Sequence, residues 1–100
     1  MRGTIWGRNI NRAKPIFQEI VNNYKLINIT PIKIIENTHC SQAWFDNGDI
    51  WTAVGAAESQ RGRLSNISLV DYEIDQELID CVIRPATRLT PYSVLDYFYL

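Results

Sequence analysis

The segment QAWFDNGDIWTAVG, residues 42–55, constrains the fold more than any other part of the sequence. Two runs rich in aromatic and β-branched residues flank the turn DNGD, and an Asn-Gly pair in this position favours a tight β-hairpin. The hairpin would bring Trp44 and Phe45 close to Ile50 and Trp51. We therefore expect an antiparallel pair of strands in the middle of the chain.

Periodicity and turn residues elsewhere predict two helices and three further strands. Apolar residues recur at helical spacing from Ala13 to Tyr24, and Pro15 suits the first turn of that helix. Asp75 suits the N-cap of a second helix, which Pro85 would end or kink. The elements expected besides the hairpin are a helix along 13–24, a strand at 30–38, a polar loop at 56–66, a strand at 67–74, a helix at about 76–84 and a strand at 91–100. The chain is thus predicted to form a single α+β domain with a mainly antiparallel sheet, an N-terminal helix and a second short helix before the C-terminal strand.

The composition argues against several classes of function. The formal net charge is −1 at pH 7, whereas proteins that coat DNA or RNA are strongly basic. No apolar run approaches the length of a membrane span, and the N-terminus lacks the apolar core of a signal peptide. We therefore expect neither a membrane nor genomic nucleic acid as a partner. Cys40 and Cys81 predict free thiols in a reducing cytosol, and the single His39 leaves few metal-ligand sets, so no cofactor or metal is expected.

Three groups of residues suggest catalysis, and each has a simpler structural explanation. The acidic segment VDYEID after a strand resembles the carboxylates that hold magnesium in nucleotide hydrolases, but the sequence has no G-x-x-x-x-G-K-[ST] loop to cradle phosphates. A strand end followed by a helix cap explains these acids more simply. His39 and Cys40 would point to opposite faces of a strand, and Asp46 and Asp49 belong to the hairpin turn. The chain is therefore not expected to be an enzyme.

The arginines indicate a binding site. Seven of the ten basic residues are arginine, the side chain best suited to bidentate contacts with phosphate. Arg84 and Arg88 lie four residues apart with a proline between them, so both can face one anionic ligand, or both can simply solvate a helix end. Arg61 in a glycine-containing loop, or Arg8 and Arg12 near the N-terminus, can add to that pocket or build another.

Two further groups would complete a nucleotide site. Asn66, at the start of a strand, can contact a ribose or a base edge, or can serve only in a turn. Trp44 and Phe45 can offer an aromatic face on which a base stacks. Aromatic side chains of a small domain also pack in the core or at an interface, so both alternatives stay open for these residues.

Several of these features occur together in a known family. Asn66 followed by a buried strand, the acid-capped helix, the segment VIRPATR and the aromatic C-terminal strand resemble the first type of phage Thoeris anti-defence protein, over about residues 30–100. Such proteins sequester cyclic ADP-ribose signals made by bacterial TIR-domain enzymes, and some also hold cyclic oligonucleotides, without degrading them. The resemblance implies that Arg84 and Arg88 contact the pyrophosphate and that Asn66 contacts a ribose or base edge. It also implies a pocket shared by the chains of a homodimer or higher oligomer, in the cytoplasm of an infected bacterial host.

A second resemblance points to a different function. The segments FDNGDIW, SQRGR and ISLVDYE are similar to the core of phage terminase ATPases, in which a strand ends in an acidic pair after a glycine-bearing loop. In this chain Tyr72 separates the acids Asp71 and Glu73, and the phosphate loop is missing. The second resemblance implies a remnant that binds nucleotide but does not hydrolyse it through that machinery.

The function expected from the sequence is that of a phage anti-defence protein. It would bind and sequester a cyclic nucleotide immune signal, either a cyclic ADP-ribose isomer or a cyclic oligonucleotide, without degrading it. The residues expected to bind the ligand are Arg84, Arg88, Asn66, Trp44, Phe45 and Arg61. The alternatives are the terminase-like remnant and a protein that inhibits a host enzyme by direct contact.

Overall fold

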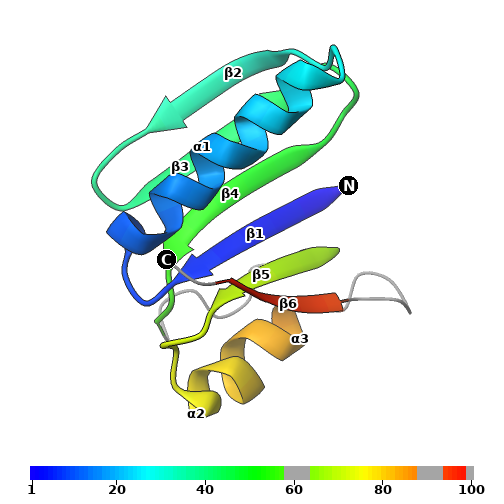
Figure 1. The fold of residues 1–100 in the computed structure, drawn as a ribbon. Coiled ribbons are helices and arrows are strands. Elements are labelled where there is room, and N and C mark those ends of the chain that lie inside the picture. The colour runs from blue at the N-terminus through cyan, green and yellow to red at the C-terminus, as the bar shows by residue number, and fades with distance from the viewer. Residues whose placement is uncertain (58–63, 88–93, 99–100) are drawn as a thin grey trace.

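The chain forms a six-stranded sheet with helices on both faces (Figure 1). The structure is a computed structural model that describes residues 1–57, 64–87 and 94–98, with only the backbone described for residues 94–98. Its elements are β1 (Arg2–Gly7), α1 (Ile10–Leu26), β2 (Pro31–Glu36), β3 (Cys40–Phe45), β4 (Ile50–Gly55), β5 (Ile67–Asp71), α2 (Gln76–Leu78), the π-helical turn η2 (Ile79–Ile83), α3 (Arg84–Ala86) and β6 (Val94–Phe98). The predicted α+β class, the N-terminal helix and the second short helical segment before the C-terminal strand are confirmed. Of the helices in the described residues, none is long and apolar enough to cross a membrane.

The sheet is mixed, with the strand order β2-β3-β4-β1-β5-β6. The strands β2, β3 and β4 form an antiparallel meander around the predicted hairpin. In contrast, β1 is parallel to both β4 and β5, and β5 is parallel to β6. The antiparallel prediction therefore describes one half of the sheet. The parallel half depends on β1, a strand that the sequence patterns did not predict.

The hairpin lies where the DNGD sequence predicts it. The backbone N–H of Phe45 donates to the Asp49 carbonyl at 2.9 Å, and the N–H of Gly48 donates to the Phe45 carbonyl at 3.0 Å. Gly48 has a φ of +94°, a conformation that glycine adopts without the steric cost of a Cβ atom. The local turn chemistry thus fixes this part of the sheet.

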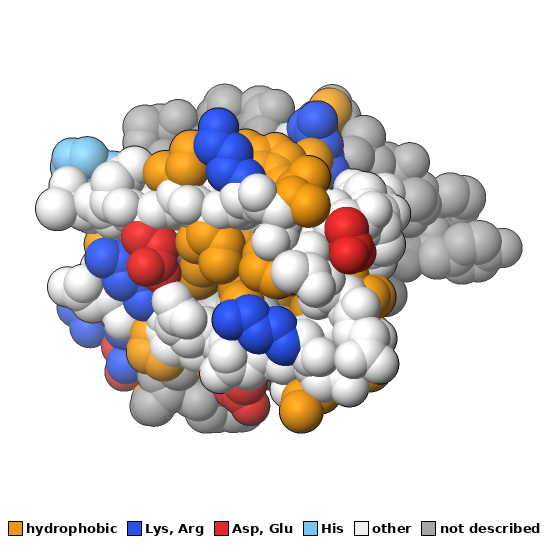
Figure 2. Space-filling model, turned by 90° about the horizontal axis from the view of Figure 1, so that it is seen from above, with side chains coloured by type: hydrophobic (Ala, Val, Ile, Leu, Met, Phe, Trp, Pro, Cys, Tyr) orange, Lys and Arg blue, Asp and Glu red, His pale blue; other side chains and the backbone are white. Residues whose placement is uncertain are grey.

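One edge of the sheet, β2, exposes apolar side chains. Ile32, Ile34 and Ile35 are exposed on this strand, and Leu26 and Ile27 are exposed where α1 ends. Figure 2, the view from above, shows apolar side chains at the surface among charged ones. Edge strands carry unpaired backbone groups, so β2 combines an open edge with exposed apolar side chains.

Two apolar clusters hold the helices against opposite faces of the sheet. Ile5 faces α1, where it packs in a cluster with Phe17 and Ala53. The next residue, Trp6, points to the other face, as the alternation of a strand requires, and packs with Val70 and the apolar side of α2-η2-α3. The helix that follows β1 and the helical run that follows β5 therefore cover different faces of the sheet (Figure 1).

A line of buried polar groups attaches this second helical run to the sheet. Trp6 Nε1 donates to Ser68 Oγ at 3.0 Å, and Ser68 Oγ lies 2.5 Å from Thr87 Oγ1. The Thr87 hydroxyl in turn donates to the Ile83 carbonyl at 2.7 Å. Each buried polar atom in this line has a partner, so the network fixes the position of the helical run without leaving an unsatisfied group.

Candidate functional site

The carboxyl ends of four parallel strands, β4, β1, β5 and β6, lie at one edge of the sheet. The register aligns Gly7 of β1 with Gly55 of β4 and places the end of β1 beside Asp71 of β5. The chain leaves β1 over one face and leaves β5 over the other, so the winding reverses between these two strands (Figure 1). Ligands of open α/β sheets bind outside the carboxyl ends of strands at such a reversal. This carboxyl edge is therefore the strongest candidate for a ligand site.

The turn from β1 into α1 is tight and needs glycine. A Cβ atom on Gly7 would lie 2.4 Å from the Asn9 carbonyl oxygen and 2.9 Å from the Ala13 nitrogen. Asn9 is the N-cap of α1, and its Oδ1 accepts a hydrogen bond from the Arg12 backbone N–H at 3.2 Å. This turn brings Arg8 and Arg12 over the end of β5.

Asp71 lies at the centre of the carboxyl edge and is completely buried. Arg12 holds it with two hydrogen bonds, from Nε to Oδ2 and from Nη2 to Oδ1, the second at 2.9 Å. The backbone N–H of Arg8 donates to Oδ2 at 2.9 Å, and that of Glu73 donates to Oδ1 at 3.1 Å. An ionised carboxylate has about four acceptor positions, so those of Asp71 are all occupied.

The surroundings act on the pKa of Asp71 in opposite directions. Burial raises the pKa, whereas hydrogen bonds from Arg12 and from the backbone of Arg8 and Glu73 lower it, and the net pKa lies below the ordinary value of 3.8. The hydrogen bond to Asp71 also raises the pKa of the Arg12 guanidinium. The pair therefore stays fully charged at neutral pH.

Asp71 is expected to make the fold sensitive to acid. Because its pKa is lower in the folded state than in the unfolded chain, its contribution to stability is complete above the unfolded value, near 3.8, and is lost as the pH falls through the folded value. Urea unfolding at about pH 6, 4.5 and 3 should show a steeper loss of stability for the wild type than for Asp71→Asn. Equal slopes for the two proteins would contradict this assignment.

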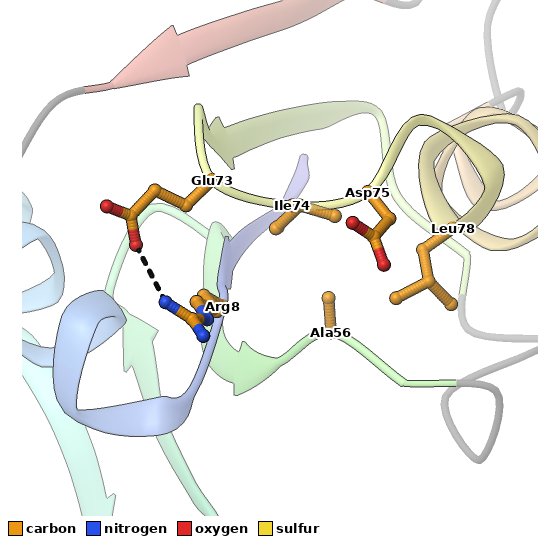
Figure 3. Close-up of a pocket in the computed structure, with 6 residues that line it drawn as sticks. All are labelled: Arg8, Ala56, Glu73, Ile74, Asp75 and Leu78. Carbon is orange, nitrogen blue, oxygen red and sulfur yellow. Dashed lines mark hydrogen bonds and ion pairs between the residues drawn. The ribbon is translucent and has the colours of Figure 1, made fainter.

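A cleft of about 310 Å³ opens beside this centre (Figure 3). Arg8 Nη1 lies 3.3 Å from Glu73 Oε2 on one side, and the Arg8 side chain is 66% exposed. The Asp75 carboxylate stands on the opposite side, and it makes no capping hydrogen bond to α2. The cleft thus combines an exposed guanidinium and two carboxylates with an apolar lining made by Ala56, Ile74 and Leu78.

At this edge, Arg8 is the group that can contact an anion, whereas Asp71 is not available to a metal ion. A hard cation such as Mg²⁺ needs free carboxylate oxygens, and both oxygens of Asp71 are fully engaged. Across residues 1–57 and 64–87, no three His, Cys, Asp or Glu side chains are placed to hold a metal ion. Arg8, in contrast, has five N–H donors, so it can contact a phosphate while one of them stays with Glu73.

Of the polar residues predicted to bind the ligand, the structure describes Asn66 and Arg84, and both lie toward the opposite, amino edge of the sheet. Asn66 precedes β5, and its Oδ1 accepts a hydrogen bond from the backbone N–H of Arg2 at 2.7 Å. The helical run that starts beside the carboxyl edge returns to this amino edge, because the backbone N–H of Ser65 donates to the Ala86 carbonyl at 2.7 Å. Asn66 and the end of α3 are thus neighbours, far along β5 from Asp71.

Arg84, the first residue of α3, has a largely exposed side chain. Its side chain is 57% exposed, and its Nε lies 3.2 Å from Asp80 Oδ1, one helical turn away. Such an exposed ion pair is typical of a solvated helix surface. Arg88 and Arg61, the other two predicted arginines, lie outside the described residues, so the structure does not place them.

The predicted aromatic residues differ in their exposure. The Trp44 ring is half-buried on β3, with Lys33 Nζ 5.3 Å from its centroid. Phe45 points to the other face and is only 2% exposed, stacked on Tyr24 with the ring centroids 4.0 Å apart. The prediction that Phe45 stacks on a base is therefore wrong, because its ring belongs to the core beneath α1.

The residues of the carboxyl edge are far apart in the sequence, and their spacing does not predict that they meet. From the sequence, Arg8 and Arg12 can add to the Arg84 pocket or build another, and the simpler explanation of Asp71 is a strand end before a helix cap. Their contact depends on β1, whose sequence RGTIWG has only three β-forming residues, placed between two glycines. The available signal was the short apolar run of residues 4–6, followed, after two intervening residues, by the helix N-cap Asn9.

Comparisons with protein-family models, with curated proteins and with solved structures found no match to this chain. The function therefore has to be inferred from the geometry of the two edges and from the residues that occupy them.

Proposed function

We propose that this chain is a remnant of a phage terminase-like ATPase and that it binds a nucleoside triphosphate at the carboxyl edge of its sheet. The observation that carries the proposal is the reversal of winding between β1 and β5, with a charged cleft directly outside it. The acids Asp71 and Glu73 and the arginines Arg8 and Arg12 meet at this point. Asn66 and Arg84, which the cyclic-nucleotide hypothesis uses, lie toward the other edge, away from this cleft.

The chemistry of the cleft supports a phosphate-bearing ligand. The exposed Arg8 guanidinium can take a phosphate oxygen with a charge-assisted hydrogen bond, and Ala56, Ile74 and Leu78 offer apolar contact beside it. The acids at the end of β5 stand where the terminase resemblance places an acidic pair. The chain contains no G-x-x-x-x-G-K-[ST] sequence. In this proposal a phosphate loop, where one takes part, is supplied by another protein. The chain alone would then bind nucleotide without hydrolysing it.

The proposal is tested by measuring the affinity for ATP in three proteins. Isothermal titration of the wild type with ATP should give saturable binding, and Arg8→Ala should weaken it about tenfold, as expected for loss of one charge-assisted contact. Arg84→Ala is the matched control, because it removes another exposed arginine that also forms an ion pair with a carboxylate. It should leave the affinity within about a factor of two, and ATP should be recovered unchanged.

The same proteins distinguish the competing functions. Cyclic ADP-ribose isomers and cyclic oligonucleotides are titrated in parallel, followed by heat denaturation and analysis of the released ligand. Intact cyclic nucleotide that is captured by the wild type and lost with Arg84→Ala, but not with Arg8→Ala, would favour the anti-defence function and a pocket at the amino edge. No binding of ATP or of any cyclic nucleotide would contradict both nucleotide hypotheses and favour an inhibitor that acts by direct protein contact.

A further inference from the structure

The Asp75 carboxylate lines the cleft without a structural role of its own. Asp75 occupies the N-cap position of α2, but its side chain makes no capping hydrogen bond. Within residues 1–57 and 64–87, no side chain forms an ion pair with it. Glu73, the other acid of the cleft, differs because Arg8 and Arg12 both form ion pairs with it. The acceptor positions of the Asp75 carboxylate are therefore available to a ligand.

The cleft has opposite charges on its two sides and apolar side chains between them. Figure 3 shows the Arg8 guanidinium beside Glu73 on one side, and the Asp75 carboxylate and the Leu78 side chain pointing toward Ala56 on the other. The cleft volume of about 310 Å³ is at the lower end of the range for small-molecule sites. We expect the ring system of one nucleobase to fill this space, with the attached phosphates extending toward the exposed Arg8.

Charge determines which end of a nucleotide lies on which side of the cleft. Phosphates are repelled by the unpaired Asp75 carboxylate and attracted by the Arg8 guanidinium. The base then lies beside Asp75, where its flat faces contact the apolar side chains of Ala56 and Leu78. In this orientation the edge of the base meets a group that only accepts hydrogen bonds, because an ionised carboxylate has no donor.

We infer that the cleft prefers guanine nucleotides and that the Asp75 carboxylate selects the base. The Watson–Crick edge of guanine has two adjacent donors, N1–H and the N2 amino group, which match the two oxygens of one carboxylate. Adenine has one donor, the N6 amino group, beside the acceptor N1, so one carboxylate oxygen would face a lone pair. This inference rests on the proposed function, since it names the base of the nucleotide bound at the same site.

The test is isothermal titration of the full chain with GTP, ITP and ATP. ITP is the matched ligand, because its base keeps N1–H and lacks the amino group at C2. The wild type should bind GTP about tenfold more tightly than ATP, with ITP between them. Asp75→Asn should reduce the difference between GTP and ATP to within about a factor of two, because an amide has one acceptor oxygen and a donor in place of the second. Glu77→Gln removes an exposed acid that does not line the cleft, so it should keep the wild-type preference.

Two results would overturn the inference and leave the proposed function intact. The first is equal affinity of the wild type for the three nucleotides, each weakened by Arg8→Ala. The second is a preference for GTP that Asp75→Asn keeps, or that Glu77→Gln loses to the same extent. If Asp75→Asn does not fold, the comparison of GTP with ITP in the wild type decides alone, because it changes only the ligand. No binding of any of the three nucleotides would contradict both the inference and the proposed function.

Discussion

Replacing Trp6 by alanine is expected to lower the free energy of unfolding by about 3–5 kcal/mol, the usual cost of removing a buried aromatic side chain. Trp6 is fully buried at the centre of the sheet, in the cluster that holds the helical run α2-η2-α3. The substitution also removes the indole N–H that donates to Ser68. A loss of this size is a large share of the total stability of a domain of this length, so urea unfolding should detect it easily.

The control for Trp6 is a substitution that keeps an aromatic ring. Trp6→Phe should cost clearly less than Trp6→Ala, because Ser68 keeps its contact with Thr87 and most of the apolar volume remains. A change of less than about 1 kcal/mol for Trp6→Ala would show that Trp6 is not a core residue. It would also contradict the central position of β1 in the sheet.

Replacing Arg12 by alanine is expected to destabilise the fold strongly. Asp71 is completely buried, and among the described residues Arg12 is its only charged partner within hydrogen-bonding distance, so the substitution would leave a buried carboxylate without a counter-charge. Thermal unfolding of Arg12→Ala at neutral pH should show a Tm lower by about 10 °C or more. The matched change Arg84→Ala breaks an exposed pair with Asp80 and should shift Tm by no more than about 3 °C.

A double substitution separates the two contributions at Arg12. Arg12→Ala/Asp71→Asn removes the unpaired charge as well as the guanidinium, so it should recover part of the Tm lost in Arg12→Ala. If the double variant is as unstable as the sum of the two single variants, the residues act independently. That result would exclude the coupling on which the carboxyl-edge site depends.

The elements predicted correctly are those whose signals are local. The Asn-Gly turn specifies the β3–β4 hairpin, and the spacing of apolar residues from Ala13 to Tyr24 specifies α1. The strand β1 lacks such a signal because it contains two glycines, which are required by close contacts with distant residues and not by strand formation. A Cβ atom on Gly3 would lie 2.5 Å from the Trp51 ring, and one on Gly7 would collide with the start of α1. The parallel half of the sheet could not be derived without this strand.

The candidate site was less predictable than the fold for the same reason. Arg12 and Asp71 meet only because β1 lies beside β5, and these residues are 59 positions apart in the chain. The spacing of Arg84 and Arg88 suggested a paired anion site, but spacing alone does not say whether a helix surface faces a pocket or solvent. Phe45 likewise lies in a strand whose alternation directs it into the core.

The central claim is that ligands bind at the carboxyl edge of the sheet, and amide chemical-shift mapping with ATP tests it most directly. In a two-dimensional ¹H–¹⁵N spectrum of the labelled protein, ATP should shift the amides of Arg8, Ala56 and Glu73 to Asp75, which surround the cleft. The amides of Asn66 and Ala86, at the amino edge, should stay in place. Shifts confined to Asn66, Ala86 and their neighbours, with none around Arg8 and Glu73, would contradict the account and move the site to the other edge of the sheet.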